Sequence, residues 1–170
     1  MKKIISLRSG TCTDRATKFL ISNNKNFSDY EIMYVNSFKE GIKLMIESGG
    51  PEDRLLIPDV SDQYREVVMH KRFDKDIQSA FWYKNPPLYL AKRKDSISNK
   101  TCATLPVLQN LINDEYDFIY KDNTQESAEY CLDGKSDLCV TNQNGLDTND
   151  LEFVEVLKSI DVYWMPFKIV

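Results

Sequence analysis

The sequence predicts an α/β fold in which largely parallel sheets carry helices on both faces. Short apolar segments alternate with amphipathic segments along the 170 residues, and this alternation is typical of strand–helix–strand units. The first unit opens with an apolar run at residues 4–7, a glycine turn at 9–13 and a helical segment. The second half repeats the pattern, so we expect mixed, mostly parallel sheets.

The first half is predicted to contain three strands that alternate with three helices. Apolar residues at helical spacing, such as Phe38, Ile42 and Met45, define the helices, and apolar runs define the strands. The Gly-Gly-Pro stretch at 49–51 ends the second helix. The predicted strands are 4–7, 30–35 and 53–60, and the predicted helices are 14–21, 38–47 and 61–71.

The second half is predicted to continue with β-rich segments, two helices and further strands. The predicted strands are 77–83, 87–92, 116–121, 138–141, 151–157 and 162–169, the helices are 104–115 and 123–132, and 144–150 is a polar loop. Residues 84–95 have the character of a crossover between two units, and the tail could return to the first unit. We therefore expect one lobe made of 1–84 plus 158–170 and another made of 85–157.

Composition and charge exclude several classes of function. The formal net charge is −4 and no basic block is present, so nucleic-acid binding is not expected. No run of about 18 apolar residues exists, so we expect no membrane span. The four cysteines lack CxxC spacing and the chain has a single histidine, so we expect no metal, no cofactor, reduced thiols and a cytoplasmic location.

Three predicted strand-to-helix junctions are rich in hydroxyl or amide side chains, at 9–13, 103–105 and 122–125. The N–H groups of a helix N-terminus and the helix dipole favour an anion such as a carboxylate. The same residue types also cap helices that bind nothing. Because ligands of open α/β sheets bind at the carboxyl ends of strands, the junctions predict a site for a small acid.

Colinear motifs resemble those of prephenate dehydratases and their relatives. Residues 9–16 resemble the family's "GPxGTxS…A" opening, 56–61 its "xxPxENS" strand end, 123–128 its "STxxAA" helix start and 137–142 its "xAAIAS" strand. Segments 85–95 and 157–167 are most similar to the bacilysin-pathway prephenate decarboxylase branch of the family. The resemblance implies a two-lobed fold like type 2 periplasmic binding proteins, with the ligand in the cleft between the lobes.

The chain departs from the dehydratase pattern where dehydration needs a proton donor. Dehydratases carry a Thr-Arg-Phe signature whose Thr is regarded as the donor to the leaving hydroxyl, and here the matching triplet is Met165, Pro166 and Phe167. Methionine has no proton to donate, and proline carries no charge. In addition, Val60 replaces a polar Asn. The resemblance therefore implies decarboxylation of prephenate without aromatisation, as in specialised, antibiotic-type metabolism.

Two other functions fit the same fold: a non-catalytic module that senses a small acid, and a dehydratase-like lyase or isomerase acting on another cyclic acid. For prephenate, Gly10, Thr11 and Thr13 are expected to bind one carboxylate. Asp59 and Ser61 are expected to contact the ring hydroxyl or relay a proton. The chemical step is assigned to Thr13 and Asp59. The ligand is a small dicarboxylic acid, and a homodimer is a further expectation.

Other residues are expected to line the same cleft. The remaining binding residues are Cys12, Thr104, Asn123, Thr124, Thr141, Asn142 and Trp164. Cys12 is interpreted as a space-filling residue, and Asp59 could instead cap the helix that follows it. The ring of Trp164 suits a cyclohexadiene, but it could equally belong to the core. The Phe-Trp-Tyr cluster at 81–83 is assigned to the core.

Overall fold

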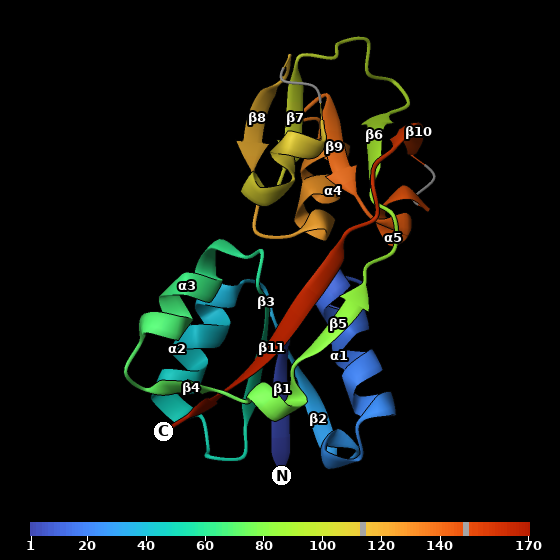
Figure 1. Ribbon diagram of the computed structural model, residues 1–170. Coiled ribbons are helices and arrows are strands. Elements are labelled where there is room, and N and C mark those ends of the chain that lie inside the picture. Colours follow the sequence, from blue (N-terminus) through green and yellow to red (C-terminus); the bar gives the residue numbers. More distant parts are fainter. Residues whose placement is uncertain (113–114, 148–149) are drawn as a thin grey trace. The chain divides into compact units, whose positions relative to one another are not determined.

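The computed structural model describes residues 1–112, 115–147 and 150–170. The chain divides into two compact units (Figure 1). Unit 1 comprises Met1–Asn85 and Asp161–Val170, and unit 2 comprises Pro86–Ile160. The first and last segments of the chain thus belong to the same unit.

Unit 1 is built on a mixed sheet of order β2-β1-β3-β11-β4, with β5 also paired to β11. Its strands are β1 (Lys2–Leu7), β2 (Tyr30–Val35), β3 (Arg54–Pro58), β4 (Phe73–Lys75), β5 (Phe81–Lys84) and β11 (Asp161–Ile169). Its α-helices are α1 (Cys12–Asn23), α2 (Phe38–Ser48) and α3 (Asp62–Met69), and 3₁₀ turns cover Lys25–Phe27 and Ile77–Ser79. β1 pairs in parallel with β2 and β3, whereas β11 is antiparallel to β3, β4 and β5.

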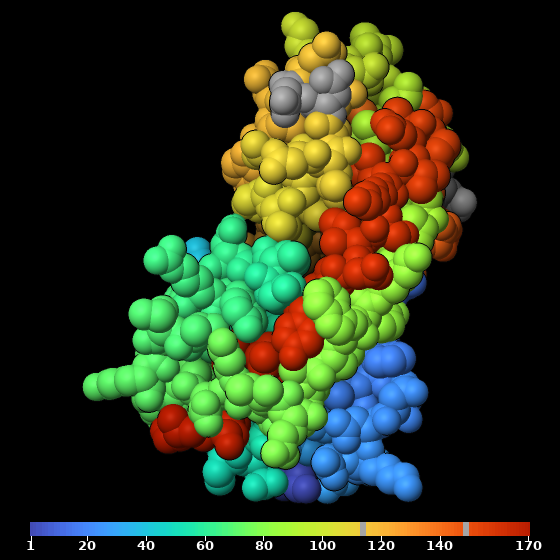
Figure 2. Space-filling view, viewed as in Figure 1, coloured from blue at the N-terminus to red at the C-terminus, as the bar shows by residue number. Residues whose placement is uncertain are grey.

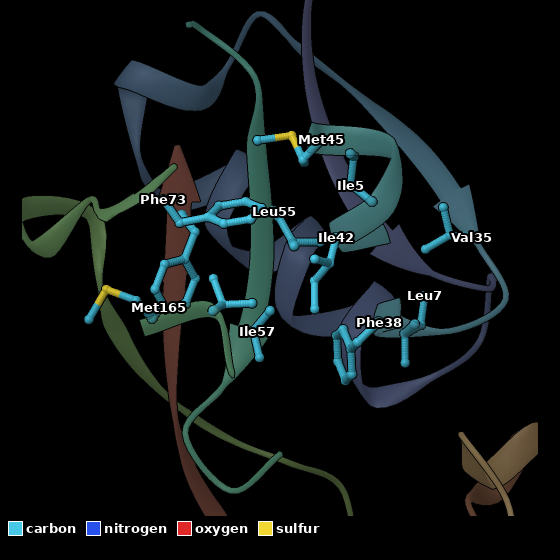
Figure 3. Close-up of a cluster of buried hydrophobic side chains, with 12 residues drawn as sticks. Ile5, Leu7, Val35, Phe38, Ile42, Met45, Leu55, Ile57, Phe73 and Met165 are labelled. Atoms are coloured by element: carbon cyan, nitrogen blue, oxygen red, sulfur yellow. The ribbon is translucent and has the colours of Figure 1, made fainter. Parts of the chain in front are cut away.

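One large apolar cluster holds the sheet of unit 1 against α2 and α3. Alternate residues of β1 and β3, including Ile5, Leu55 and Ile57, meet Ile42 and Met45 of α2 (Figure 3). Each fully buried side chain of this size stabilises the fold by about 1.5–3 kcal/mol. α1 lies on the opposite side of the sheet from α2 and α3 (Figure 1), so helices cover both faces.

Unit 2 contains a five-stranded sheet of order β10-β6-β9-β7-β8. Its strands are β6 (Tyr89–Arg93), β7 (Thr101–Thr104), β8 (Asp117–Tyr120), β9 (Leu138–Thr141) and β10 (Leu151–Val156). Its helices are α4 (Thr124–Leu132), the short α5 (Gln143–Leu146) and a 3₁₀ helix at Pro106–Leu111. β7 pairs in parallel with β8 and β9, and β6 pairs antiparallel with β9 and β10.

Small side chains dominate the buried cluster beneath α4, so this helix packs closely on the sheet. The cluster includes Ala91, Ala103, Ala128 and Cys139. Gly145 of α5 also packs closely, since a Cβ atom there would lie 2.0 Å from the Thr141 hydroxyl oxygen. The end of β9 is therefore held between α4 and α5.

The predicted α/β class is confirmed, but several elements differ from expectation. The helix predicted at 104–115 is instead the end of β7 followed by a 3₁₀ helix, with 113 and 114 outside the described residues. Pro106 explains the difference, because Leu105 before it takes an extended conformation and starts no regular α-helix. The loop predicted at 144–150 includes most of α5, and 148 and 149 lie outside the described residues.

Candidate functional site

The turn between β1 and α1 is formed by Gly10 and capped by Thr11. Gly10 has a φ of 87°, a conformation that glycine adopts without steric cost. The Thr11 hydroxyl donates to the Arg8 carbonyl at 2.8 Å and accepts the Asp14 amide at 3.2 Å. Thr11 therefore satisfies one of the free N–H groups at the start of α1.

A buried carboxylate of the chain itself, Asp14, binds at this turn. Its side chain, 2% exposed, accepts the Gly10 amide at 2.8 Å, the Tyr34 hydroxyl at 2.7 Å and the Lys18 ammonium at 2.8 Å. Burial alone would raise the pKa of Asp14, but the hydrogen bonds from Lys18, Gly10 and Tyr34 outweigh it, so the pKa is lowered. The Gly10 amide, predicted to bind a ligand carboxylate, is thus already hydrogen-bonded to Asp14.

The sequence analysis did not single out Asp14, although a signal for it exists. Thr11 and Asp14 have the spacing of a capping box, in which the acidic residue reaches back to an amide before the helix. Here the acidic side chain accepts from Gly10, the residue preceding the N-cap. An acidic residue three positions after a predicted N-cap therefore predicts that an amide of the turn is hydrogen-bonded within the protein.

Cys12 and Thr13 occupy the first turn of α1. Burial raises the pKa of the Cys12 thiol to about 11, although Arg15 opposes the shift. The thiol is therefore neutral at physiological pH and is a poor nucleophile. Thr13 is buried, and its carbonyl accepts the Thr17 hydroxyl at 2.8 Å.

Asp59 and Ser61 follow β3, at the same edge of the sheet as the β1–α1 turn because β1 and β3 are parallel neighbours. Ser61 caps α3, accepting the Gln63 amide at 3.3 Å and donating to the Gln63 side chain at 3.0 Å. The alternative role of Asp59 as the cap of this helix is therefore wrong. The Asp59 side chain is exposed, and its amide donates to the Tyr163 carbonyl at 2.9 Å.

Unit 2 brings its own set of expected binding residues together. Thr104 ends β7, Asn123 follows β8 and Thr141 ends β9, and these three strands are parallel neighbours in the sheet. Asn123 caps α4 by accepting the Glu126 amide at 2.9 Å, and Asn142 caps α5. The carboxyl-terminal edge of the sheet thus carries five polar residues, all buried: Thr104, Asn123, Thr124, Thr141 and Asn142.

Thr124, the first residue of α4, has an unused hydroxyl. Its side chain is 5% exposed, and its Oγ1 has no hydrogen-bond partner within residues 1–112, 115–147 and 150–170. Its carbonyl accepts the Thr141 hydroxyl at 3.3 Å, which ties the start of α4 to the end of β9. A buried hydroxyl without a partner costs about 1–3 kcal/mol, and an acceptor supplied by a ligand would remove that cost.

Gln125 is a neighbour that the sequence analysis did not select. Its side-chain Oε1 is also buried without a partner in the described part of the chain. An amide side chain can present either its acceptor or its donor end. The N-terminus of α4 therefore carries two adjacent polar side chains with unused hydrogen-bonding capacity.

The two tryptophans occupy contrasting environments, and only that of Trp82 differs from expectation. Trp164 is 1% exposed and lies in the core of unit 1, whereas Trp82, assigned to the core, is 66% exposed. In β11, Trp164 faces away from Met165, because successive side chains of a strand point to opposite faces. The core assignment of Trp82 is wrong, and Trp164 offers a ligand almost no exposed surface.

Among the described residues, no group of three histidine, cysteine, aspartate or glutamate side chains is arranged to hold a metal ion. No helix in the described ranges is long and apolar enough to cross a membrane. The two sets of residues offer hydrogen bonding from hydroxyls, amides and helix N-termini, together with the Asp59 carboxylate.

Sequence comparison gives a relative with a named reaction. The chain is 28% identical over 129 residues to a prephenate decarboxylase from Planktothrix agardhii (strain NIVA-CYA 126/8). The chain resembles the prephenate dehydratase-like family. The match covers 68% of this chain and 62% of the relative, which is less than two thirds of the relative's length. No model of a known protein family matches the chain.

Solved structures confirm the periplasmic-binding-protein-like fold expected of the prephenate dehydratase-like family. A prephenate dehydratase from Arthrobacter aurescens, in complex with L-Phe, is similar with a TM-score of 0.64 and 9% identity, covering 100% of this chain and 61% of that one. The periplasmic VFT2 domain of Bordetella pertussis BvgS is similar with a TM-score of 0.62 and 13% identity, covering 99% and 80%. At these identities, the likeness establishes the fold alone.

Proposed function

We propose that this protein is a carboxy-lyase that decarboxylates prephenate without aromatising the ring. The similarity to a named prephenate decarboxylase supports the substrate and the reaction type. The fold is one that a prephenate dehydratase shares. The match with this relative covers only 62% of the relative's length. The proposed reaction therefore also has to be argued from the residues of this chain.

The observation that carries the proposal is the environment of Met165 and Pro166. Both are buried in β11, in register with Ile57 and Leu56 of β3, and Met165 belongs to the apolar core of unit 1. The resemblance aligns them with the Thr and Arg of the dehydratase signature. This position therefore supplies neither a proton for a leaving hydroxyl nor a charge, and loss of hydroxide is disfavoured.

Decarboxylation balances without that proton donor. The bond between the ring and its carboxylate breaks, and carbon dioxide leaves. The electron pair of that bond moves through the diene, and a ring carbon takes up one proton. The hydroxyl stays on the ring, so the product is not aromatic. Such a step needs an oriented substrate, a partly desolvated carboxylate and a positioned proton source.

We assign the binding of carboxylates to the helix N-termini. In unit 2, the unused Thr124 hydroxyl and its neighbours Thr104, Asn123, Thr141 and Asn142 supply hydrogen bonds at the start of α4. In unit 1, the Gly10 amide is already hydrogen-bonded to Asp14 and the Thr11 hydroxyl to Arg8, so of the expected residues at this turn we assign only Thr13 to the ligand, with Cys12 filling space. Asp59 and Ser61 contact the ring hydroxyl or relay the proton. The ring of Trp164 packs in the core of unit 1 and presents no face to a cyclohexadiene, so we assign it no contact with the ligand.

The test is to incubate the purified protein with prephenate and to follow carbon dioxide and ultraviolet absorption together. The proposal predicts one carbon dioxide per prephenate consumed, with no aromatic product. Formation of phenylpyruvate would show a dehydratase and contradict the proposal. Saturable binding without turnover would show a small-acid sensor and would also contradict it.

The setting of the reaction is part of the proposal. The four cysteines are free thiols, three of them buried in unit 2, which suits a reducing compartment such as the cytoplasm. A product that keeps its hydroxyl and diene is not a direct precursor of an aromatic amino acid, which suits specialised, antibiotic-type metabolism. Neighbouring genes that encode further enzymes for non-aromatic rings would support this setting.

A further inference from the structure

An exposed tryptophan, Trp82, packs beside the half-buried Tyr163 at the junction of β5 and β11 in unit 1. Trp82 is 66% exposed, and its ring centroid lies 5.1 Å from that of Tyr163, its register partner in β11. The surface of unit 1 shows β5, in light green, beside β11, in red (Figure 2). Tryptophan and tyrosine side chains are enriched where a ligand or partner covers them.

A carboxylate lies in the same row. The Asp59 amide donates to the Tyr163 carbonyl at 2.9 Å, and the register of β3 with β11 places Asp59 opposite Tyr163. Tyr163 of β11 is thus bonded through its backbone to Asp59, in the turn that follows β3, and paired with Trp82 of β5 on its other side. The Asp59 side chain is exposed, so a ligand that covers the two rings meets this carboxylate.

A carboxylate beside two aromatic rings favours the hydroxyl-bearing ring of a small acid over its carboxylate groups. The negative charge of Asp59 repels a ligand carboxylate, but its oxygens accept a hydrogen bond from a hydroxyl. The faces of Trp82 and Tyr163 favour a flat, uncharged ring over a charged group. The row is thus complementary to a ring that bears a hydroxyl, and it excludes the carboxylate ends of the same molecule.

We propose that Asp59, Tyr163 and Trp82 form a subsite for the hydroxyl-bearing ring of a cyclic acid. The inference rests on the proposed function, since it assigns to this row the ring of the acid that is decarboxylated. It adds Trp82 and Tyr163 as residues that determine specificity for the ring. Trp82 thus takes the ring contact that the sequence analysis considered for Trp164 beside a core role.

Tryptophan fluorescence tests the subsite without relying on turnover. The chain has two tryptophans, of which Trp164 is buried and Trp82 is open to a soluble quencher such as acrylamide. Saturating prephenate is expected to reduce acrylamide quenching of the wild-type protein severalfold. In the Trp82→Phe variant, which keeps an aromatic ring, the remaining Trp164 signal is expected to be insensitive to prephenate.

Substitution supplies a second readout. Trp82→Ala is expected to raise the KM for prephenate about three- to tenfold, the range that one lost ring contact produces, with Trp82→Phe close to wild type. Ile77→Ala, which removes another exposed apolar side chain of unit 1, is the matched control and is expected to change nothing. Because Trp82 is largely exposed, its variants are expected to unfold at the wild-type urea concentration.

The outcomes separate this inference from the proposed function. If prephenate is turned over, but Trp82 stays fully open to acrylamide and Trp82→Ala keeps the wild-type KM, the subsite is wrong and the function stands. If the wild-type protein neither binds nor converts prephenate, both are wrong. If Trp82→Ala fails to fold, the quenching experiment on the wild-type protein alone decides the matter.

Discussion

Replacing Asp14 by alanine is expected to destabilise unit 1 and to loosen the β1–α1 turn. The substitution removes a buried carboxylate that accepts from the Gly10 amide, the Tyr34 hydroxyl and the Lys18 ammonium. The Lys18 side chain is 54% exposed and Tyr34 is 43% exposed, so water replaces the lost partner at both. The Gly10 amide is only partly exposed and loses more.

The size of the effect follows from these exposures. A hydrogen bond to a charged group contributes about 1.5–3 kcal/mol, and an exposed ion pair contributes about 0–1 kcal/mol. We therefore expect Asp14→Ala to lower the free energy of unfolding by about 2–4 kcal/mol. Lys18→Ala, the matched control, removes a half-exposed ammonium and leaves the Gly10 and Tyr34 hydrogen bonds to Asp14 in place, so it is expected to cost less than Asp14→Ala.

Urea unfolding at several pH values measures this effect. Because the pKa of Asp14 is lowered in the folded protein, its contribution is fully present above its unfolded pKa near 3.8. The contribution is lost as the pH falls through the lower, folded-state pKa. The difference between wild type and Asp14→Ala should thus be largest at neutral pH and shrink in acid. A loss from Lys18→Ala equal to that from Asp14→Ala, or a difference independent of pH, would refute the reasoning.

Three further predictions concern packing, a loop anchor and a thiol. Gly145→Ala would place a Cβ 2.0 Å from the Thr141 hydroxyl, so thermal unfolding should show a loss of about 1–3 kcal/mol, whereas Gly50→Ala should be neutral. Asp137 accepts hydrogen bonds from both the amide and the hydroxyl of Thr101, and these bonds lower its pKa. Asp137→Asn weakens this acceptor and should cost about 1–2 kcal/mol at pH 7, a cost that shrinks as the pH falls below 3.8 and through the lowered pKa of Asp137. Cys12→Ala should keep turnover within about twofold, and alkylation of Cys12 should stay slow until the pH nears its pKa of about 11.

The sequence correctly predicted those helices and strands for which the spacing of apolar residues and the capping residues indicate the same boundaries. β2 and α2 were recovered within a residue, because alternation, helical spacing and a serine cap all indicate the same boundaries. β7 was missed because its four residues are recognisable only by their pairing with β8 and β9. The antiparallel position of β11 depends on a return to unit 1 from a distant part of the sequence.

The candidate site was predictable in its residue types but not in their free hydrogen-bonding capacity. Hydroxyl and amide residues after apolar runs do gather at the carboxyl ends of parallel strands within each unit. Sequence alone could not show that Asp14 accepts the Gly10 amide or that the Thr124 hydroxyl has no partner in the described residues. Nor could it show which tryptophan is open to solvent, since both lie in similar aromatic stretches.

Calorimetric titration of prephenate into the Thr124→Val variant tests the central claim most directly. Valine keeps the shape of threonine and removes only a hydroxyl that has no partner in the described residues, so the stability of the variant should equal or exceed that of wild type. If the hydroxyl donates to a ligand carboxylate, its loss should weaken binding at least about tenfold. Wild-type affinity in a stable Thr124→Val protein would show that the acid is not held at the start of α4.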